Sequence, residues 1–348
     1  MRFEFFHRLT DVRLSQTHRL QDDEPPFVEA LEFDVQARIK GGREYEPLID
    51  VRGLPCWPSA PRYEQLENGE QLVGHDLESQ KDPVVAERKT LQVAADFDLV
   101  VIGVGLGAIP YVCREVVARD PRWRAMVDHV KTVATQAFQL WMHADMKELG
   151  YPDAPITASG FVEPFDTWAD MRHLIPQESW SEAPRSLAYF CSVLPDPDGP
   201  QDPLDRGVSA RQQERARRNA IRFLNQDIVR LWPAATDARG KFRWDLLADP
   251  ADGTGTKSSA VDEERFASQF WKANVDPSDR YVLSLPGSSS YRISPLDGAY
   301  DNLTIAGDWT DCGFNGGCVE AAFMSGRLAA HAISQSPPLE DIVGFDHP

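Results

Sequence analysis

The strongest candidate for chemistry is a glycine-rich segment near the C-terminal end of the sequence. "NLTIAGDWTDCGFNGGCVEAAFMSGRLAAHAI" predicts a strand at 302–306, then Gly307 and Asp308, a short loop containing three glycines, and a helix from near Cys318 to about Ile333. Such a loop points free backbone N–H groups and the positive end of the helix dipole at one place. That place stabilises a ligand that becomes negative, such as a reduced flavin, and a carboxylate beside it can accept hydrogen bonds from hydroxyl groups.

A second glycine cluster, Gly103-Val104-Gly105-Leu106-Gly107-Ala108, satisfies the G-x-G-x-x-G/A pattern of dinucleotide-binding loops. Three features oppose that interpretation: Pro110 stands where the helix should run, no second strand ending in an acid follows, and the preceding sequence is β-rich. The favoured interpretation is a buried strand over residues 96–104 whose glycines let it bend and pass close to another backbone. A nicotinamide dehydrogenase that uses Gly103–Ala108 stays open as a weaker alternative.

The C-terminal segment resembles the FAD motif of the flavin-containing amine oxidase and phytoene desaturase superfamily, which includes hydroxysqualene dehydroxylase-like proteins. That motif has an apolar strand, Ala-Gly-Asp/Glu, an aromatic residue or Thr, a Gly-rich turn, Val-Glu-Gly/Ala-Ala, Ser-Gly and an alanine-rich helix. "AGDWTDCGFNGGCVEAAFMSGRLAAHAI" matches over almost its whole length, and "RYVLSLPGSSSYRI" is similar to the segment that precedes the motif in desaturase-like members. "DFDLVVIGVGLGAIP" then resembles a late strand of the flavin domain.

The resemblance implies the cofactor, FAD, and the residues that bind it. In the family, the turn and its carboxylate touch the ribityl–pyrophosphate part of FAD, and the helix start faces the flavin N1/O2 edge, mostly through backbone N–H groups. An aromatic residue after the carboxylate could border the ring or the substrate cavity. The predicted cofactor-binding residues are Gly307, Asp308, Trp309, Gly316, Gly317, Cys318, Val319 and Glu320.

Binding of FAD is expected to be non-covalent, because no cysteine is convincing as an attachment point. Cys113 and Cys191 are expected to be core residues. Cys318 stands where monoamine oxidases have an aromatic residue, so a simple amine cage is not expected. No residue is identified as catalytic.

The superfamily begins with a strand and a true G-x-G-x-x-G loop, and nothing before residue 97 matches it. The resemblance therefore predicts an FAD-dependent oxidoreductase that transfers hydride to flavin, either as a C-terminal fragment or as one subunit of a split enzyme. Its expected partners are an N-terminal half or subunit carrying GxGxxG and a small apolar or amine substrate. Alone, the chain is expected to bind FAD weakly. The alternative is a non-catalytic or degenerate partner subunit that keeps the fold.

The expected fold is of the α/β class with α+β elements. It consists of a partial FAD-binding Rossmann-like domain of the amine oxidase type, without the N-terminal βαβ fingerprint unit, plus a mixed substrate domain. The expected segments are 1–110 as the middle part of the FAD-binding domain, 111–290 as the substrate-binding domain, 291–335 as the C-terminal FAD-binding segment and 336–348 as a tail.

Two helices carry informative patterns. "SARQQERARRNAIRFLNQDIVRLWP" predicts an amphipathic helix, with one apolar face formed by Ala216, Ala220, Phe223, Ile228 and Leu231. In the C-terminal helix, Ala322, Gly326 and Ala330 recur every four positions, which predicts a face that approaches a sheet closely.

Composition excludes several classes of function. The formal net charge of -18 disfavours nucleic acid or an anionic membrane as a partner. No run approaches the roughly 20 apolar residues of a membrane span, and no signal peptide is recognised. Five scattered cysteines fit a reducing compartment, so a cytoplasmic location is expected. The cysteine and histidine spacing predicts no metal site.

Overall fold

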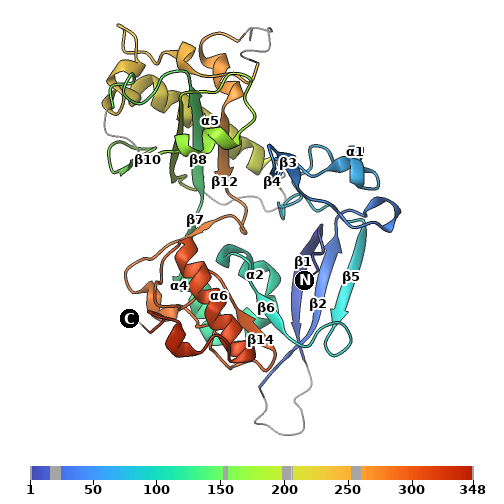
Figure 1. Ribbon diagram of the computed structural model, residues 1–348. Coiled ribbons are helices and arrows are strands. Elements are labelled where there is room, and N and C mark those ends of the chain that lie inside the picture. Colours follow the sequence, from blue (N-terminus) through green and yellow to red (C-terminus); the bar gives the residue numbers. More distant parts are fainter. Residues whose placement is uncertain are drawn as a thin grey trace. The chain divides into compact units, whose positions relative to one another are not determined.

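The computed structural model describes residues 2–15, 25–151, 156–197, 205, 207–251 and 260–346 (Figure 1). The fold mixes helices and strands, which confirms the α/β class. The chain forms two compact units. Unit 1 comprises Met1–Tyr45, Tyr63–Val133 and Asp276–Pro348, and unit 2 comprises Glu46–Arg62 and Ala134–Val275. These limits differ from the functional segments predicted above, whose binding roles stay predictions.

Unit 1 contains a short parallel sheet in which β6 (Val100–Ile102) pairs with β14 (Leu303–Ile305). An antiparallel sheet has the order β1-β2-β5, with β1 at His7–Leu14, β2 at Val28–Val35 and β5 at Glu87–Gln92. A third pair joins β7 (Thr132–Val133) to β13 (Tyr281–Val282). Asn302, just before β14, links it to β2, because its amide exchanges hydrogen bonds with the Val28 backbone.

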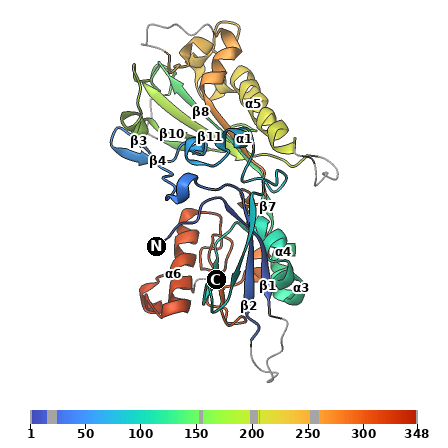
Figure 2. The same cartoon turned by 90° about the vertical axis from the view of Figure 1, so that its right-hand side faces the viewer.

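The α-helices of unit 1 are α1 (Gly69–Leu72), α2 (Ile109–Val112), α3 (Arg114–Arg119), α4 (Pro121–His129) and α6 (Val319–Ser334). Short 3-10 helices lie at Lys40–Gly42, Tyr63–Gln65, Leu106–Ala108, Ser288–Tyr291 and Leu339–Asp341. Asp120 caps α4 by accepting a hydrogen bond from the Arg122 amide, and Pro121 is the first residue of that helix. Within unit 1, α6 and the α3–α4 pair lie on opposite sides of the strands (Figure 2).

Unit 2 is built on a five-stranded antiparallel sheet of order β12-β8-β11-β10-β9. Its strands are β8 (Thr135–Met142), β9 (Thr157–Ser159), β10 (Thr167–Asp170), β11 (Ser186–Val193) and β12 (Phe270–Asn274), and β3 (Ile49–Val51) forms a separate hairpin with β4 (Leu54–Cys56). The helix α5 (Val208–Gln226) packs against β8 and β12. Further 3-10 helices lie at Arg172–Gln177, Ile228–Arg230, Pro233–Ala235, Trp244–Leu246 and Asp262–Ser268.

The predicted amphipathic helix is confirmed as α5, which ends at Gln226, before the predicted Ile228 and Leu231 positions. All five predicted apolar positions of this segment are buried. Its Phe223 joins an aromatic core with Phe138 and Phe190 of the sheet. The apolar face of the helix therefore packs against one face of the unit 2 sheet.

The predicted inner face of α6 is wrong. Ala321, Ser325 and Leu328 face the core, whereas Ala322 is exposed and a side chain added at Gly326 would meet nothing within 4 Å. Because α6 carries apolar residues both on the packed side and on the opposite side, where Val319 and Phe323 are exposed, periodicity alone does not identify the side that packs. The segment predicted as a tail helps to select that side, since its Ile342 is buried with Ala321 and Leu328.

The predicted buried strand over 96–104 is shorter and more open than expected. Its regular part is β6, in which Val100 and Ile102 are buried but Val101 is 45% exposed. Successive side chains of a strand point to opposite faces, so Val101 lies on the face opposite Val100 and Ile102, and that face is partly open. In the described part of the chain, no helix is both long and apolar enough to cross a membrane.

Candidate functional site

The candidate site starts where the two parallel strands of unit 1 end. Ile305 pairs with Ile102, so Gly103 follows β6 and Gly307 follows β14 at the same edge of the sheet. In open α/β sheets, ligands bind outside the carboxyl ends of parallel strands. The structure therefore brings the first glycine cluster and the C-terminal motif to one edge.

Gly307 forms a tight turn that is tied to α6. Its N–H donates to the Oγ of Ser325 at 3.0 Å, and its carbonyl oxygen accepts from the Oγ1 of Thr310 at 2.9 Å. Its φ of 157° and the indole of Trp309 require glycine, because a Cβ at residue 307 would lie 2.4 Å from the Trp309 Nε1. The turn is thus held between β14, Trp309 and the helix.

Trp309 is 1% exposed and lies in the core of unit 1. The structure therefore places its indole inside the unit and not on an open surface beside a ring or substrate. The side chain of Trp309 thus shapes the turn at Gly307, and its backbone amide has no acceptor among the described residues.

Asp308 is half-buried in the same turn. Burial raises the pKa of its carboxyl group above the usual 3.8, and the nearby Arg292 guanidinium acts in the opposite direction. Arg292 is 6% exposed, and burial lowers the pKa of its guanidinium from the usual value. Its Nη1 donates to the carbonyl oxygen of Asp308 at 2.7 Å. A cation behind the turn therefore favours the ionised form of the Asp308 carboxyl group.

The start of α6 is open. Cys318 is the N-cap residue, and its Sγ accepts a hydrogen bond from the Ala321 amide at 3.4 Å. Val319 is 81% exposed, and Glu320 is exposed too. Among the described residues, none accepts a hydrogen bond from the backbone amides of Gly316, Gly317, Cys318, Val319 and Glu320. Free amides at the positive end of a 16-residue helix form a place where an oxygen-rich or anionic group is stabilised.

Sequence reasoning missed the side chains that hold this loop from the 281–293 segment. Tyr281 donates through its hydroxyl to the carbonyl oxygen of Gly317, and the Oγ of Ser284 donates to the carbonyl oxygen of Asn315 at 2.7 Å. Arg292 holds the turn at Asp308 as described above. The signal was present in "RYVLSLPGSSSYRI", where polar residues interrupt an apolar pattern, but spacing alone does not tell which loop they reach.

The first glycine cluster packs against another backbone. A Cβ at Gly105 would lie 2.7 Å from the carbonyl oxygen of Ser278, and one at Gly107 would lie 2.3 Å from that of Pro277. At Gly103 the nearest atom would be 4.0 Å away. Because the 277–278 backbone fills the space beside these glycines, the structure supports an architectural role and gives the nicotinamide alternative no support.

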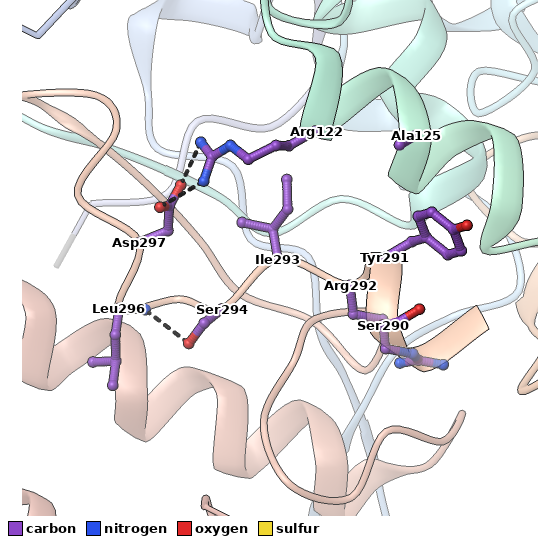
Figure 3. Close-up of a pocket in the computed structure, with 9 residues that line it drawn as sticks. All are labelled: Arg122, Ala125, Ser290, Tyr291, Arg292, Ile293, Ser294, Leu296 and Asp297. Atoms are coloured by element: carbon purple, nitrogen blue, oxygen red, sulfur yellow. Dashed lines mark hydrogen bonds and ion pairs between the residues drawn. The ribbon is translucent and has the colours of Figure 1, made fainter. Parts of the chain in front are cut away.

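A pocket of about 360 Å³ in unit 1 contains none of the predicted site residues. Arg122 pairs there with Asp297 through two hydrogen bonds of 2.9 and 3.1 Å (Figure 3). Arg292 also lines this pocket, but its guanidinium points away from the Arg122–Asp297 pair. In the part of the chain that the structure describes, no group of His, Cys, Asp or Glu residues could hold a metal ion.

The two cysteines that were expected in the core differ in burial. Cys113 is fully buried, and burial raises the pKa of its thiol to about 12. Cys191 is half-buried on β11, and burial raises its thiol pKa as well. Cys113 is thus a core residue, whereas Cys191 lies at the edge of the core.

Comparison with known proteins supports the superfamily that the C-terminal motif predicts. The model of the family described as flavin containing amine oxidoreductase matches residues 253–334. One solved structure similar to this chain is an oxidoreductase from Methanosarcina mazei, with 13% sequence identity and a TM-score of 0.39. The match covers 69% of this chain and 44% of that one, so the chain spans less than half of that protein's length. No curated protein matches the chain. Residues 253–334 confirm the superfamily predicted from the C-terminal motif: this chain carries a segment of the flavin-containing amine oxidoreductase family.

Proposed function

We propose that this chain forms the flavin-proximal part of an FAD-dependent oxidoreductase. The observation that carries the proposal is the open start of α6, where a row of backbone amides has no acceptor among the described residues and lies in the same loop system as Asp308. These residues fall inside the segment that matches a flavin-containing family. Bound FAD would supply the hydride-accepting chemistry, with a small apolar or amine substrate as the donor.

The hydrogen-bonding groups of this loop match those that FAD presents. Asp308 would accept hydrogen bonds from ribityl hydroxyls while its carboxyl group is ionised. The amides of Gly317, Cys318 and Val319 would donate to the N1/O2 edge, where negative charge is stabilised by the helix dipole. Neither contact needs a covalent bond, so we propose that FAD is held non-covalently. The indole of Trp309 would act through the shape of the loop, and the backbone amides of Trp309 and Gly316, which have no acceptor among the described residues, would face the cofactor as well.

We further propose that a partner polypeptide, or a further part of the same protein, completes the cofactor site. In the ladder with β14, the N–H and C=O groups of Val100 and Ile102 point toward β14, so those of Val101 point to the outer edge. No described residue bonds to the Val101 backbone. The outer face of α6 carries Phe323, which is 68% exposed. A parallel strand on β6 and a helix over α6 would cover both, as parallel sheets require.

The experiment is a titration of the purified chain with FAD, followed by quenching of flavin fluorescence. Because the partner is absent, we expect weak binding that Asp308→Asn weakens further. Glu67→Gln, an exposed carboxylate elsewhere in unit 1, is the matched control and should leave the affinity unchanged. Equal affinities for the wild type and Asp308→Asn would count against the assigned site, and a tight stoichiometric complex of the chain alone would count against the partner.

A further inference from the structure

Three side chains of the 281–292 segment donate hydrogen bonds to carbonyl oxygens of the glycine-rich loop. Arg292 donates to the carbonyl oxygen of Asp308, Ser284 to that of Asn315, and Tyr281 to that of Gly317. We call these three residues the carbonyl clamp. Arg292 also donates to the Oγ of Ser284 at 3.4 Å, so two members of the clamp are themselves connected.

Because the peptide group is planar, the carbonyl clamp also fixes the direction of the backbone N–H group that follows each bound carbonyl. In a trans peptide, the C=O of one residue and the N–H of the next residue point in opposite directions. The peptides that follow Asp308, Asn315 and Gly317 are trans, because the cis bonds of the described chain lie elsewhere. Holding these oxygens therefore directs the N–H groups of Trp309, Gly316 and Cys318 away from the clamp. In the described part of the chain, none of these three amides has an acceptor.

Arg292 adds charge to this geometry. Its guanidinium is buried without a carboxylate ion pair among the described residues, and its Nε has no hydrogen-bond partner there. The polar contacts recorded for its Nη atoms are the carbonyl oxygens of Asp308 and Thr310 and the hydroxyl of Ser284. A buried cation is costly, and this one contacts carbonyl oxygens of the loop and lies near the carboxylates of Asp308 and Asp311, which favour its charged form. Gly317 is part of the same fit, because a Cβ there would lie 2.7 Å from the Tyr281 ring.

We propose that Tyr281, Ser284 and Arg292 are positioning residues for the flavin. They hold loop carbonyls on one side so that the amides of Trp309, Gly316 and Cys318 face the cofactor. The inference rests on the proposed function of the same loop. It assigns roles to three residues outside the glycine-rich motif, none of which needs to touch the cofactor.

The test measures FAD affinity by flavin fluorescence and compares variants of the full chain. Ser284→Ala removes one exposed hydroxyl and is expected to fold, and it should weaken FAD binding about threefold to tenfold, the value of one oriented hydrogen bond. Arg292→Gln should weaken binding at least as much, and Arg292→Lys should restore part of the loss because it keeps the charge. Ser290→Ala is the matched control, since its Oγ donates to the Gly287 carbonyl oxygen outside the loop.

A second measurement separates the clamp from general stability and from the proposed function. The melting temperature of Ser284→Ala should equal that of Ser290→Ala. A loss of FAD affinity without a change in melting temperature then reports the orientation of the amides. If Asp308→Asn weakens FAD binding but Ser284→Ala and Arg292→Gln bind like the wild type, the clamp is overturned and the site stands. If none of the three variants changes affinity, the site itself is overturned.

Discussion

The indole Nε1 of Trp309 donates to the carbonyl oxygen of Val104 at 3.0 Å and thereby joins the loops that follow β14 and β6. The two residues are 205 positions apart in the sequence. This bond closes the carboxyl edge of the parallel sheet and holds Gly307 against the indole. The loops that carry the two glycine clusters are thus in contact. The cluster at Gly103–Gly107 packs against another part of the backbone, and the cluster at Gly313–Gly317 leads to the open start of α6.

Replacing Trp309 by Phe keeps an aromatic ring but removes the donor to Val104 and part of the buried volume of the indole. We expect a loss of about 1–3 kcal/mol in the free energy of unfolding, because a carbonyl oxygen loses its partner near the core. The measurement is urea unfolding followed by circular dichroism. Trp57→Phe, at an indole that is 69% exposed, is the control and should change stability by less than about 0.5 kcal/mol. Equal losses in both variants would contradict the structural role of Trp309.

The glycines of the first cluster can be compared with one another. Gly105→Ala and Gly107→Ala should each destabilise the chain by about 1–3 kcal/mol, because the new methyl group would collide with the Ser278 or Pro277 carbonyl oxygen. Gly103→Ala should be nearly neutral, since only one atom lies 4.0 Å away. Thermal unfolding checks this order. A dinucleotide-binding loop would instead show loss of NAD binding in Gly105→Ala.

The pH dependence of FAD binding should report Asp308. Its pKa is raised above 3.8 by burial, so affinity should fall as the pH drops through that raised pKa and the carboxylate becomes a neutral acid. Arg292→Gln removes the cation that lowers this pKa, so the midpoint should move to higher pH. Asp308→Asn should abolish this transition, as measured by titrations at a series of pH values. A midpoint that survives in Asp308→Asn would assign it to another group.

The raised pKa of Asp308 also predicts the direction in which the stability of the chain without cofactor changes with pH. Because the folded chain holds the Asp308 proton more tightly than the unfolded chain, its contribution is fully present below pH 3.8. That contribution is lost as the pH rises through the raised pKa. Asp308→Asn should therefore flatten the stability curve in this range, which urea unfolding at several pH values would show.

Thiol reactivity tests the proposal of non-covalent FAD. Cys113 is buried and has a thiol pKa of about 12, so it should resist alkylation at pH 8 until the chain is unfolded. Denaturation of a flavin complex should then release all of the flavin and leave five alkylatable cysteines. Mass spectrometry counts the modified residues. A flavin adduct on Cys113 or Cys191 would show that attachment is covalent.

Local pattern was enough to predict the elements with a strong signal. The β14–loop–α6 sequence and the apolar face of α5 follow from apolar periodicity and glycine. The inner face of α6 could not be predicted, because helical periodicity identifies a face only when the opposite face is polar. The extent of β6 depended on which strands lie beside it, and that is a tertiary property.

The candidate site divides in the same way. Gly307, Asp308 and the α6 start carry a motif that can be recognised from residue types and order. The carbonyl clamp could not be recognised from the sequence. Tyr281, Ser284 and Arg292 lie 16 to 36 positions from the residues that they bind. They bind backbone carbonyl oxygens, which every residue has, so residue types do not identify the partners. Trp309 belongs to the motif, but its burial reflects the approach of β6 and not its neighbours in sequence.

The most direct test of the flavin assignment is hydrogen–deuterium exchange of the full chain with and without a saturating concentration of FAD, resolved by mass spectrometry. The assignment predicts slower exchange in peptides that cover residues 307–320, because the free amides there acquire an acceptor, and no change over 103–108. Protection confined to 103–108, or no protection over 307–320 at saturation, would contradict it.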